Sequence, residues 1–518
     1  MRDPRTHPGV LAADIERGRH RRAAIHQRLR AVLDALGAEL PAEGSTRALL
    51  TAVERALAAP DASRIWLLIA VLSGRLPDRP QVLSALRLAR LSGVLAAVAR
   101  QLPQHRPGWP AERGPWPAVR VVTEGVLVDL HHTADTTLAT GIQRVARQCS
   151  LRWARDHDLT VVRWSARFDR LLPLSDVERE RAFFGTPAPD RTDPAGVAVV
   201  PWRCTYLLPE LMTEPVRARA LEALVAYAEC RTGMIGFDCV PVTSAETTAD
   251  GMGGGFASML SAAAGMDRIA AISQAAGDEY SGWRTMLGGA GLTGPDVRAV
   301  SLAVEADRAS EAAVAAARDQ LTVAGLPMVL VVGSHEPRKN HLAILHAMEL
   351  LWRQGLAFSV VFVGGNAWRS ERFTQRLGEL QAVGRPVETR SGLSDDVLWG
   401  AYAAAHLVLF PSLNEGFGLP VGEALGSGTP VVTSGYGSMR EIAATGGALF
   451  VDPRDDDDIA AAVGRLLREP DLHAELSAQA RARTPRSWDE YAAETWDYFV
   501  GAGPAEVGTG PAEVGAGA

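Results

Sequence analysis

The chain has 518 residues, of which 47% are hydrophobic and 22% charged, and its formal net charge is −7. This length is too great for one hydrophobic core, so we expect two or three globular domains and exclude a disordered chain. The acidic balance gives no overall support for nucleic-acid binding.

Residues 1–104 are predicted to form a helical domain, because apolar residues recur there at helical spacing. The first residues are polar, and no stretch approaches the roughly 18 apolar residues that span a bilayer. We therefore expect a cytoplasmic protein and leave peripheral membrane contact open. The arginine-rich helix faces are candidates for binding a protein partner, although solvated surface is the commoner explanation.

A linker and an α/β region follow. Residues 105–117 are rich in proline, glycine and tryptophan, which indicates a linker. Over residues 118–305, β-branched apolar runs alternate with helical segments, which predicts a parallel sheet flanked by helices. Residues 169–220 fit neither pattern. The alternating runs are residues 119–130, 141–156, 159–164, 231–242, 256–265, 267–273 and 274–287.

The strongest alternation lies in residues 306–502. Between Pro327 and Pro453, continuous apolar runs typical of buried parallel strands alternate with helical segments, and helices continue to Val500. A second doubly wound sheet is expected here. The repetitive tail, residues 503–518, is expected to be disordered.

The rarest residue types of the chain gather in the loops after these strands. Lys339 is the only lysine among 53 basic residues, and the three asparagines are Asn340, Asn366 and Asn414. Ligands of open parallel sheets bind at the carboxyl ends of the strands. A lysine in a chain that otherwise uses arginine indicates a task that suits a compact ammonium group. We therefore expect the functional site at this edge.

The segment NEGFGLPVGEAL, residues 414–425, has the features of a diphosphate site. Its glycines, Gly416 and Gly418, permit close approach of the backbone, and a proline follows in the first helical turn. Free N–H groups at a helix N-terminus favour an anion. Glu415 and Glu423 are acceptor-only carboxylates suited to sugar and ribose hydroxyls. A nucleotide sugar would satisfy all of these groups.

Arg338 and Lys339 are expected to open the helix after the first strand of the second sheet. Two cations gain nothing from the positive end of a helix dipole, so we expect them to serve an anion. An ammonium group there can stabilise the charge that develops on a leaving phosphate.

The segments VGSHEPRKNH, residues 332–341, and FPSLNEGFGLPVGEALGSGTPVVTSGYGSMREI, residues 410–442, resemble family 4 of the retaining glycosyltransferases. The EPRKN motif is similar to the branch that includes mannosyltransferases of bacterial polysaccharide assembly. The resemblance is strong over residues 327–500 and weaker over 119–301. It implies an α/β GT-B fold with two facing Rossmann-like domains. The helical region before residue 105 lies outside the resemblance and is expected to be an appended domain. Residues 118–305 would bind the acceptor, and residues 306–502 the nucleotide sugar.

The resemblance also implies roles for single residues. Glu415 would contact hydroxyls of the donor sugar, Glu423 the ribose, and Lys339 the diphosphate. The family's second basic residue follows the glycine that ends the strand, where this chain has Ser334, so Arg338 is the expected substitute. Catalysis is thus expected to involve Glu415, Lys339 and Arg338. The donor-binding positions are Gly141, Gly333, Ser334, Lys339, Gly392, Glu415, Gly416, Phe417, Gly418, Leu419 and Glu423.

The implied reaction is the transfer of a hexosyl group, with retention at the anomeric carbon, to a saccharide, a lipid-linked glycan or a small molecule. GDP-mannose is one candidate donor. The family reacts through an oxocarbenium-like state, in which the departing phosphate helps to deprotonate the acceptor. Many members carry a histidine near the sugar. His131 and His132 are candidates here, although exposed loop histidines are the alternative interpretation. Asp238 matches a recurrent aspartate of the family.

No cofactor or metal is expected besides the nucleotide sugar as co-substrate. The four cysteines have no CxxC spacing. The acidic run at residues 455–458 is better explained as a helix cap than as a metal site. Two other functions stay open: a GT-B-like sugar-nucleotide epimerase, and a degenerate protein that binds a sugar nucleotide or acts as a scaffold.

Overall fold

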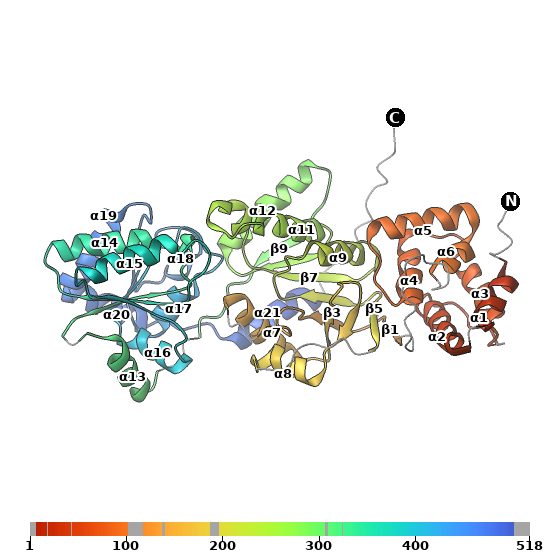
Figure 1. Ribbon diagram of the computed structural model, residues 1–518, viewed down its shortest axis with the longest axis horizontal. Coiled ribbons are helices and arrows are strands. Elements are labelled where there is room, and N and C mark those ends of the chain that lie inside the picture. Colours follow the sequence, from red (N-terminus) through yellow and green to blue (C-terminus); the bar gives the residue numbers. More distant parts are fainter. Residues whose placement is uncertain are drawn as a thin grey trace.

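A computed structural model describes residues 7–17, 19–42, 44–101, 118–136, 140–186, 196–305, 309–323 and 325–501. Three bodies lie in a row: an N-terminal helical domain, a central α/β domain and a second α/β domain (Figure 1). The α/β class predicted from the alternating runs is confirmed. The expected linker at residues 105–117 and the expected disordered tail at residues 503–518 lie outside the described residues.

The helical domain forms around one helix, α4 (Ala62–Ser73), whose central eight residues are apolar and buried. Every residue from Ile65 to Leu72 of the fourth helix is buried, and short polar side chains cap its neighbours. Asp78 and Gln81 make a reciprocal capping box at the start of the fifth helix. The helices are α1 (Pro8–Arg17), α2 (Arg19–Ala35), α3 (Thr46–Ala56), α4 (Ala62–Ser73), α5 (Arg79–Ser92) and α6 (Val94–Gln101).

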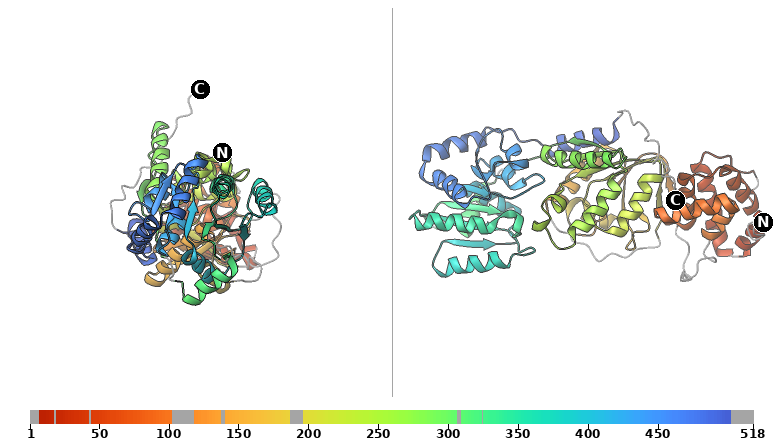
Figure 2. Two further views of the ribbon diagram at one scale, coloured as in Figure 1. Left: turned by 90° about the vertical axis from the view of Figure 1, so that its left-hand side faces the viewer. Right: turned by 90° about the horizontal axis from the view of Figure 1, so that it is seen from above.

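The helical domain is docked on the central domain by specific contacts as well as by apolar packing. The Trp202 indole N–H donates to the Ala35 carbonyl at 3.0 Å. Arg75 pairs with Asp169 at 3.1 Å, and the Leu76 amide donates to the Asp169 carbonyl. The view from above shows this domain at the far end of the central domain from the second α/β domain (Figure 2).

The central domain holds a nine-stranded sheet in the order β1-β5-β4-β3-β2-β6-β7-β8-β9. All neighbouring strands are parallel except β4, which is antiparallel to β3 and β5. The strands are β1 (Val119–Val122), β2 (Val126–Asp129), β3 (Thr160–Trp164), β4 (Leu171–Pro173), β5 (Ala198–Pro201), β6 (Thr205–Leu208), β7 (Arg231–Gly236), β8 (Arg268–Ala271) and β9 (Asp296–Ala299). The helices are α7 (Gly141–Asp156), α8 (Asp176–Phe184), α9 (Pro215–Tyr227), α10 (Val240–Thr243), η3 (Ala245–Thr247), α11 (Met252–Ala263) and α12 (Gln274–Gly289).

Residues 169–220, which showed no clear sequence pattern, supply β4, β5 and β6 of this sheet. They contain a three-residue antiparallel strand, two four-residue parallel strands and the helix α8. Strands this short carry too few residues for a period of two to be recognised.

The second α/β domain has six parallel strands in the order β12-β11-β10-β13-β14-β15. Its strands β10, β11 and β13 are almost entirely buried, as expected for continuous apolar runs covered on both faces. The strands are β10 (Met328–Val332), β11 (Ser359–Val363), β12 (Val387–Arg390), β13 (Leu407–Phe410), β14 (Val431–Ser434) and β15 (Ala448–Val451). The helices are α13 (Glu311–Leu321), η4 (Pro337–Lys339), α14 (His341–Arg353), α15 (Glu371–Ala382), α16 (Asp395–Ala404), α17 (Leu419–Gly426), α18 (Gly437–Ile442), α19 (Asp456–Arg468) and α20 (Pro470–Arg481).

The strand order reverses direction between β10 and β13. Counted within this domain, the order is that of a dinucleotide-binding sheet, and its ligands bind where the loops after the two central strands diverge. The loops after β10 and β13 are those that carry Lys339 and Glu415.

The last helix, α21 (Trp488–Val500), departs from the expected domain of residues 306–502. It packs against α7 and β8 of the central domain (Figure 1). The Trp153 indole N–H donates to the Ala492 carbonyl at 2.9 Å, and Arg231 donates to the Val500 carbonyl at 3.0 Å. Helical periodicity shows which face of α21 is apolar, but it does not show which sheet covers that face.

Among the described residues, no helix combines the length and the apolar character needed to cross a bilayer.

Replacing Trp153 by alanine is expected to destabilise the chain by about 3–5 kcal/mol, because the indole is fully buried between α7 and α21. It contacts the rings of Trp496 and Phe499 and holds the Ala492 carbonyl. Chemical unfolding followed by fluorescence measures the change. Phe184→Ala, at a side chain that is 60% exposed, is the control and should stay within about 0.5 kcal/mol of the unaltered chain. Equal stabilities of the two variants would contradict the docking of α21.

Candidate functional site

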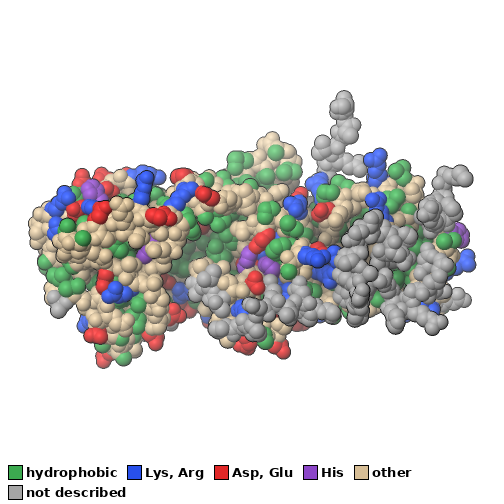
Figure 3. Space-filling model, in the orientation of Figure 1, with side chains coloured by type: hydrophobic (Ala, Val, Ile, Leu, Met, Phe, Trp, Pro, Cys, Tyr) green, Lys and Arg blue, Asp and Glu red, His purple; other side chains and the backbone are tan. Residues whose placement is uncertain are grey.

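The candidate site lies at the carboxyl ends of β10 and β13, on the side of the second domain that faces the central domain. A hollow with hydrophobic side chains on its floor separates these two domains in the space-filling view (Figure 3). The two loops are joined by the backbone of Arg338, whose carbonyl accepts from the Leu413 amide at 2.9 Å and the Ser412 hydroxyl at 3.0 Å.

A buried cluster of charges forms the centre of the site. Glu415 binds Lys339 Nζ through Oε1 at 2.6 Å and Arg338 through Oε2 at 2.5 Å. The Ser412 hydroxyl donates to the same Oε1 at 2.6 Å. Arg338 also binds Glu336 at 2.6 Å. The structure thus brings together the three residues expected to take part in catalysis.

The charges in this cluster control one another's protonation. Burial raises the pKa of Glu415, but Arg338 and Lys339 outweigh it and lower the pKa to about 2. Burial lowers the pKa of Lys339, and Glu415 opposes that shift. Burial also raises the pKa of Glu336. Glu415 is therefore ionised throughout the neutral range, and it is held as an acceptor.

Arg338 and Lys339 lie in the single turn η4, not in the first turn of α14 as expected. Asn340, which separates the two elements, has φ of 62°, a left-handed conformation that asparagine tolerates. Its side-chain amide donates to the carbonyls of Pro411 and Pro453, and so joins three loops.

The aliphatic part of the Lys339 side chain packs over Gly333, the glycine that directly follows β10. A Cβ on Gly333 would lie 3.4 Å from Lys339 Cε, and the φ of Gly333 is 145°. The ammonium also lies 4.7 Å from the centre of the Phe410 ring. The neighbouring Ser334 is exposed and carries no charge. The β10 loop therefore presents one ammonium, and Arg338 is already engaged by two carboxylates.

The loop before α17 has free backbone donors. Gly418 has φ of 95° and is the N-cap residue of α17, while the side chain of Phe417 is buried in the core. In the described part of the chain, no group accepts from the amides of residues 416–419. Such amides at a helix N-terminus form an anion site. Leu419, the first residue of α17, is the last of the expected donor-binding residues in this loop.

Glu423 lies one turn inside α17 and is engaged from both domains. The Tyr402 hydroxyl donates to Oε2 at 2.7 Å, and Arg144 of the central domain binds Oε1 at 2.6 Å. Burial and the neighbouring Glu423 raise the pKa of Tyr402 well above its usual value, so it stays a donor. Glu423 is only 8% exposed.

The central domain touches this site closely. A Cβ on Gly416 would lie 2.6 Å from the Phe237 carbonyl and 2.8 Å from Asp238 Oδ2. The Ser273 hydroxyl donates to the Gly416 carbonyl at 2.6 Å. Burial raises the pKa of Asp238 to about 6, with Arg338 opposing the shift. A Cβ on Gly141, at the start of α7, would lie 3.4 Å from Leu419.

A second contact between the domains ends at a helix N-terminus. Glu441 of α18 accepts from the Gln274 amide at 2.9 Å and the Ala275 amide at 3.3 Å, both in the first turn of α12. The Asn414 amide donates to the hydroxyls of Thr243 and Ser244. Together these bonds hold α18 and the loop after β13 against the central domain.

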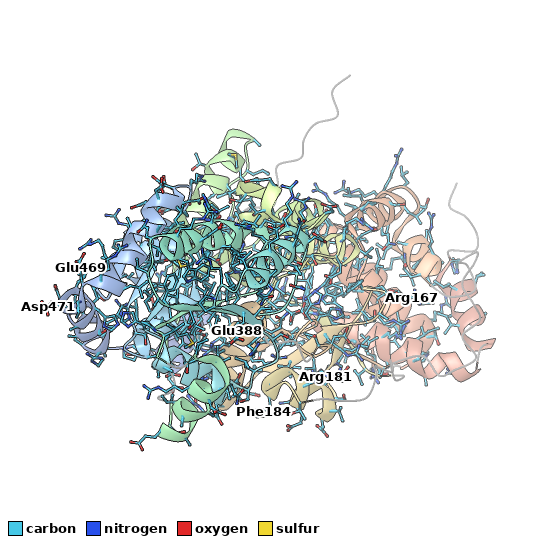
Figure 4. All side chains as sticks on the ribbon, turned by 60° about the vertical axis from the view of Figure 1, so that its left-hand side comes forward. Arg167, Arg181, Phe184, Glu388, Glu469 and Asp471 are labelled. Atoms are coloured by element: carbon cyan, nitrogen blue, oxygen red, sulfur yellow. The ribbon has the colours of Figure 1, made fainter. Side chains whose placement is uncertain are left out.

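One expected donor-binding position lies away from this cluster. Gly392 follows the edge strand β12, two strands from β10, and it is exposed with φ of 69°. The side chain of Glu388 on the same strand is seen in Figure 4. A role for Gly392 in donor binding stays a prediction.

His131 and His132 are not exposed loop histidines. His131 is buried beside Phe168. His132 Nε2 binds Glu214 at 2.7 Å, and this hydrogen bond, with the charge of Glu210, raises the histidine pKa although burial lowers it. Both follow β2 and belong to a polar network of the central domain.

The acidic run at residues 455–458 is a helix cap, as predicted. Asp455 accepts from the amides of Asp457 and Asp458 at the start of α19. The labelled residues Glu469 and Asp471, where α19 meets α20, lie at the outer end of the second domain (Figure 4). No group of three or more metal-ligating side chains converges within the described ranges. The absence of a cofactor stays a prediction.

Sequence reasoning missed Arg144, Tyr402 and Glu441. Arg144 stands three residues after the glycine of TGIQRV, and its position beside that turn is the one signal that could have indicated it. Tyr402 is one of several aromatic residues on amphipathic helices, and Glu441 is one of many surface-type carboxylates. Their partners come from distant segments, so only the fold identifies them.

Residues 315–483 match the family model described as Glycosyl transferases group 1. This stretch is a group 1 glycosyltransferase domain. The candidate cluster and α17 both lie inside the group 1 domain, which confirms the family resemblance of the two segments that contain them.

Two relatives of this chain are mannosyltransferases. The serotype-specific mannosyltransferase WbdA of Escherichia coli is 25% identical over 359 residues, which cover 67% of this chain and 43% of WbdA. The MMP alpha-(1->4)-mannosyltransferase of Mycolicibacterium hassiacum is 40% identical over 126 residues, which cover 24% of this chain and 31% of that protein. The chain thus spans less than half the length of these curated relatives.

Two solved structures show the fold. Sucrose-phosphate synthase from Thermosynechococcus elongatus has a TM-score of 0.52 at 16% identity, covering 73% of this chain and 98% of that chain. Anabaena HepE in complex with UDP-glucose has a TM-score of 0.51 at 16% identity, covering 72% and 99%. The two α/β domains have the GT-B fold that the resemblance implied.

Replacing Glu415 by glutamine is expected to destabilise the chain by about 3–5 kcal/mol at pH 7, because two cations whose side chains are only 17% and 11% exposed lose their shared partner. The folded-state pKa of about 2 is below the usual 4.5, so the carboxylate stabilises the fold above pH 4.5. That contribution is lost as the pH falls towards 2, and the difference between the two chains should shrink over this window. Urea unfolding at several pH values measures it.

Asp238, whose pKa burial raises to about 6, adds stability as the pH falls through 6. The charge of Glu415 contributes to that raised pKa, so this gain should be smaller in Glu415→Gln than in the unaltered chain. The exposed Glu379→Gln is the control, and it should leave stability unchanged. A Glu415→Gln chain as stable as the unaltered chain at pH 7 would contradict the cluster's electrostatic role.

Proposed function

We propose that this chain is a retaining glycosyltransferase that moves a hexosyl group from a nucleoside-diphosphate sugar to a glycan, lipid-linked glycan or small-molecule acceptor. The observation that carries the proposal is the Lys339–Glu415 pair beside the free amides before α17. It supplies an ammonium, a fixed acceptor and an anion site within one group 1 glycosyltransferase domain.

Each part of a nucleotide sugar has a matching group. The diphosphate would bind the amides of residues 416–419 and the ammonium of Lys339. Glu415, which stays ionised because its pKa is about 2, would accept from the sugar hydroxyls. Glu423 would accept from the ribose hydroxyls, since each of its oxygens keeps a lone pair beside Tyr402 or Arg144.

The proposed chemistry relies on positioning and on charge. As the glycosidic bond to the diphosphate breaks, negative charge grows on the phosphate oxygens, and Lys339 and the helix amides stabilise that charge. The departing phosphate accepts the proton of the acceptor hydroxyl, so that the new bond forms on the face of the sugar that the phosphate leaves. This step needs no enzymic carboxylate pair of the glycosidase type.

The acceptor would enter from the central domain, through the hollow between the α/β domains (Figure 3). The mannosyltransferase relatives support a mannosyl donor such as GDP-mannose. HepE, solved in complex with UDP-glucose, supports a nucleotide sugar as the donor class. No metal ion is required in this scheme, because Lys339 and the helix amides provide the positive potential.

A thermal-shift panel tests the donor. One or more of the GDP, UDP, ADP and TDP sugars should raise the unfolding temperature, because a ligand stabilises the state that it binds. Lys339→Ala should lose most of that shift, while Arg372→Ala, at an exposed arginine of α15, should keep it. Stabilisation by none of the sugars would overturn the donor site, and an equal shift in Lys339→Ala would remove Lys339 from it.

Release of free nucleoside diphosphate distinguishes an enzyme from a binding protein or scaffold. Lys339→Ala is expected to lower kcat about a hundredfold, because one preorganised donor to the leaving group is lost. Nuclear magnetic resonance of the first product should show the anomeric configuration of the donor sugar. An inverted product would contradict the retaining mechanism, and a free epimerised sugar nucleotide would favour an epimerase.

A further inference from the structure

The cations of the second domain are already balanced before any diphosphate arrives. Arg338 and Lys339 face the carboxylates of Glu336 and Glu415. Asp238 of the central domain adds a further acidic group beside them. A diphosphate brings at least two negative charges, and Ser334 has no positive charge with which to offset them. A further cation beside the site would therefore add to the positive potential that Lys339 and the helix amides supply.

Two helix N-termini converge at this point from the two domains. A Cβ on Gly141, the first residue of α7, would lie 3.4 Å from Leu419, the first residue of α17. The N-termini of α7 and α17 therefore lie close together, and two positive ends of helix dipoles this near to each other favour an anion beside them. The α7 N-cap residue, Thr140, makes no capping bond through its side chain to the first turn of that helix.

Arg144 extends from the first turn of α7 to this same place. Its NH1 lies 2.6 Å from Glu423 Oε1, and its guanidinium lies 5.9 Å from the centre of the Trp399 ring. The Arg144 side chain keeps 32% of its surface exposed. A cation of the central domain is therefore held at the start of α17, one turn from the free amides.

The Arg144 guanidinium has N–H groups that Glu423 does not use. Arginine carries five N–H groups, and Glu423 takes one nitrogen of Arg144. Within the described ranges, no acceptor is recorded for Nε or NH2 of Arg144. The planar group can therefore bind Glu423 on one edge and a phosphate oxygen on another without leaving the position seen here.

We propose that Arg144 binds the diphosphate of the nucleotide sugar, supplying from the central domain the second cation that Ser334 does not provide. The inference rests on the proposed function. Glu423 then has two tasks, since it accepts from the ribose and orients Arg144 towards the phosphates. Donor binding would link the two domains directly, because the diphosphate lies between the first turns of α7 and α17.

Calorimetric titration of the full chain tests this proposal. The probes are whichever of GDP, UDP, ADP and TDP stabilises the unaltered chain most, and the nucleoside that lacks its phosphates. Arg144→Gln should bind the diphosphate at least about tenfold more weakly, as expected for one lost charge-assisted hydrogen bond. Its affinity for the nucleoside should change less than about twofold. The difference should shrink as salt is added.

Two further variants separate a phosphate contact from a structural role. Arg144→Lys keeps the charge and should recover part of the diphosphate affinity. Arg152→Gln removes another arginine of α7, which faces Asp489 of α21, and should leave both affinities unchanged. Circular dichroism and unfolding temperatures of the variants confirm that they are folded.

An unchanged diphosphate affinity in Arg144→Gln, or an equal loss for the nucleoside, would overturn this inference and leave the proposed function in place. Absence of binding of any nucleoside diphosphate by the unaltered chain would overturn both.

Discussion

The ionised carboxylate of Glu415, buried between Arg338 and Lys339, is the constraint on which the rest of the site depends. Burying a carboxylate is unfavourable unless cations and hydrogen bonds compensate. Here the loop after β10 provides both cations and the loop after β13 provides the carboxylate. Neither loop can shift without leaving a charged group unpaired. The cluster therefore fixes the two loops at the carboxyl edge of the second sheet, and it also fixes the start of α17.

Hydroxyl groups from β14 and α18 strengthen this constraint from behind. The Ser434 hydroxyl donates to the Ser412 carbonyl, and the Ser438 hydroxyl donates to the Glu415 carbonyl. The loop that carries Glu415 is therefore held along its backbone as well as at its side chain. Such a preorganised site lowers the reorganisation needed when charge develops on a leaving group.

The same loop is also the place where the two α/β domains meet. Gly416 has no side chain, and this allows its backbone to reach Phe237 and the Ser273 hydroxyl. Glu441 accepts from the first turn of α12, and the chain returns from the second domain so that α21 packs on α7 of the central domain. Residues that flank the site thus make the contacts between the two domains. A change in the conformation of the site therefore also changes these contacts.

The sequence by itself determined the α/β alternation, the group 1 segments and the positions of Glu415, Glu423 and Lys339, because strand periodicity, helix starts and rare residue types are local properties. It also indicated the right edge of the sheet, since loops after parallel strands share one edge. Tertiary structure alone decided that α21 belongs to the central domain and that Arg338 is engaged by two carboxylates. It also placed Arg144 on Glu423, 279 positions away in the chain. Contacts between distant segments leave no periodic trace in a sequence, because each partner keeps the local pattern of its own helix or loop.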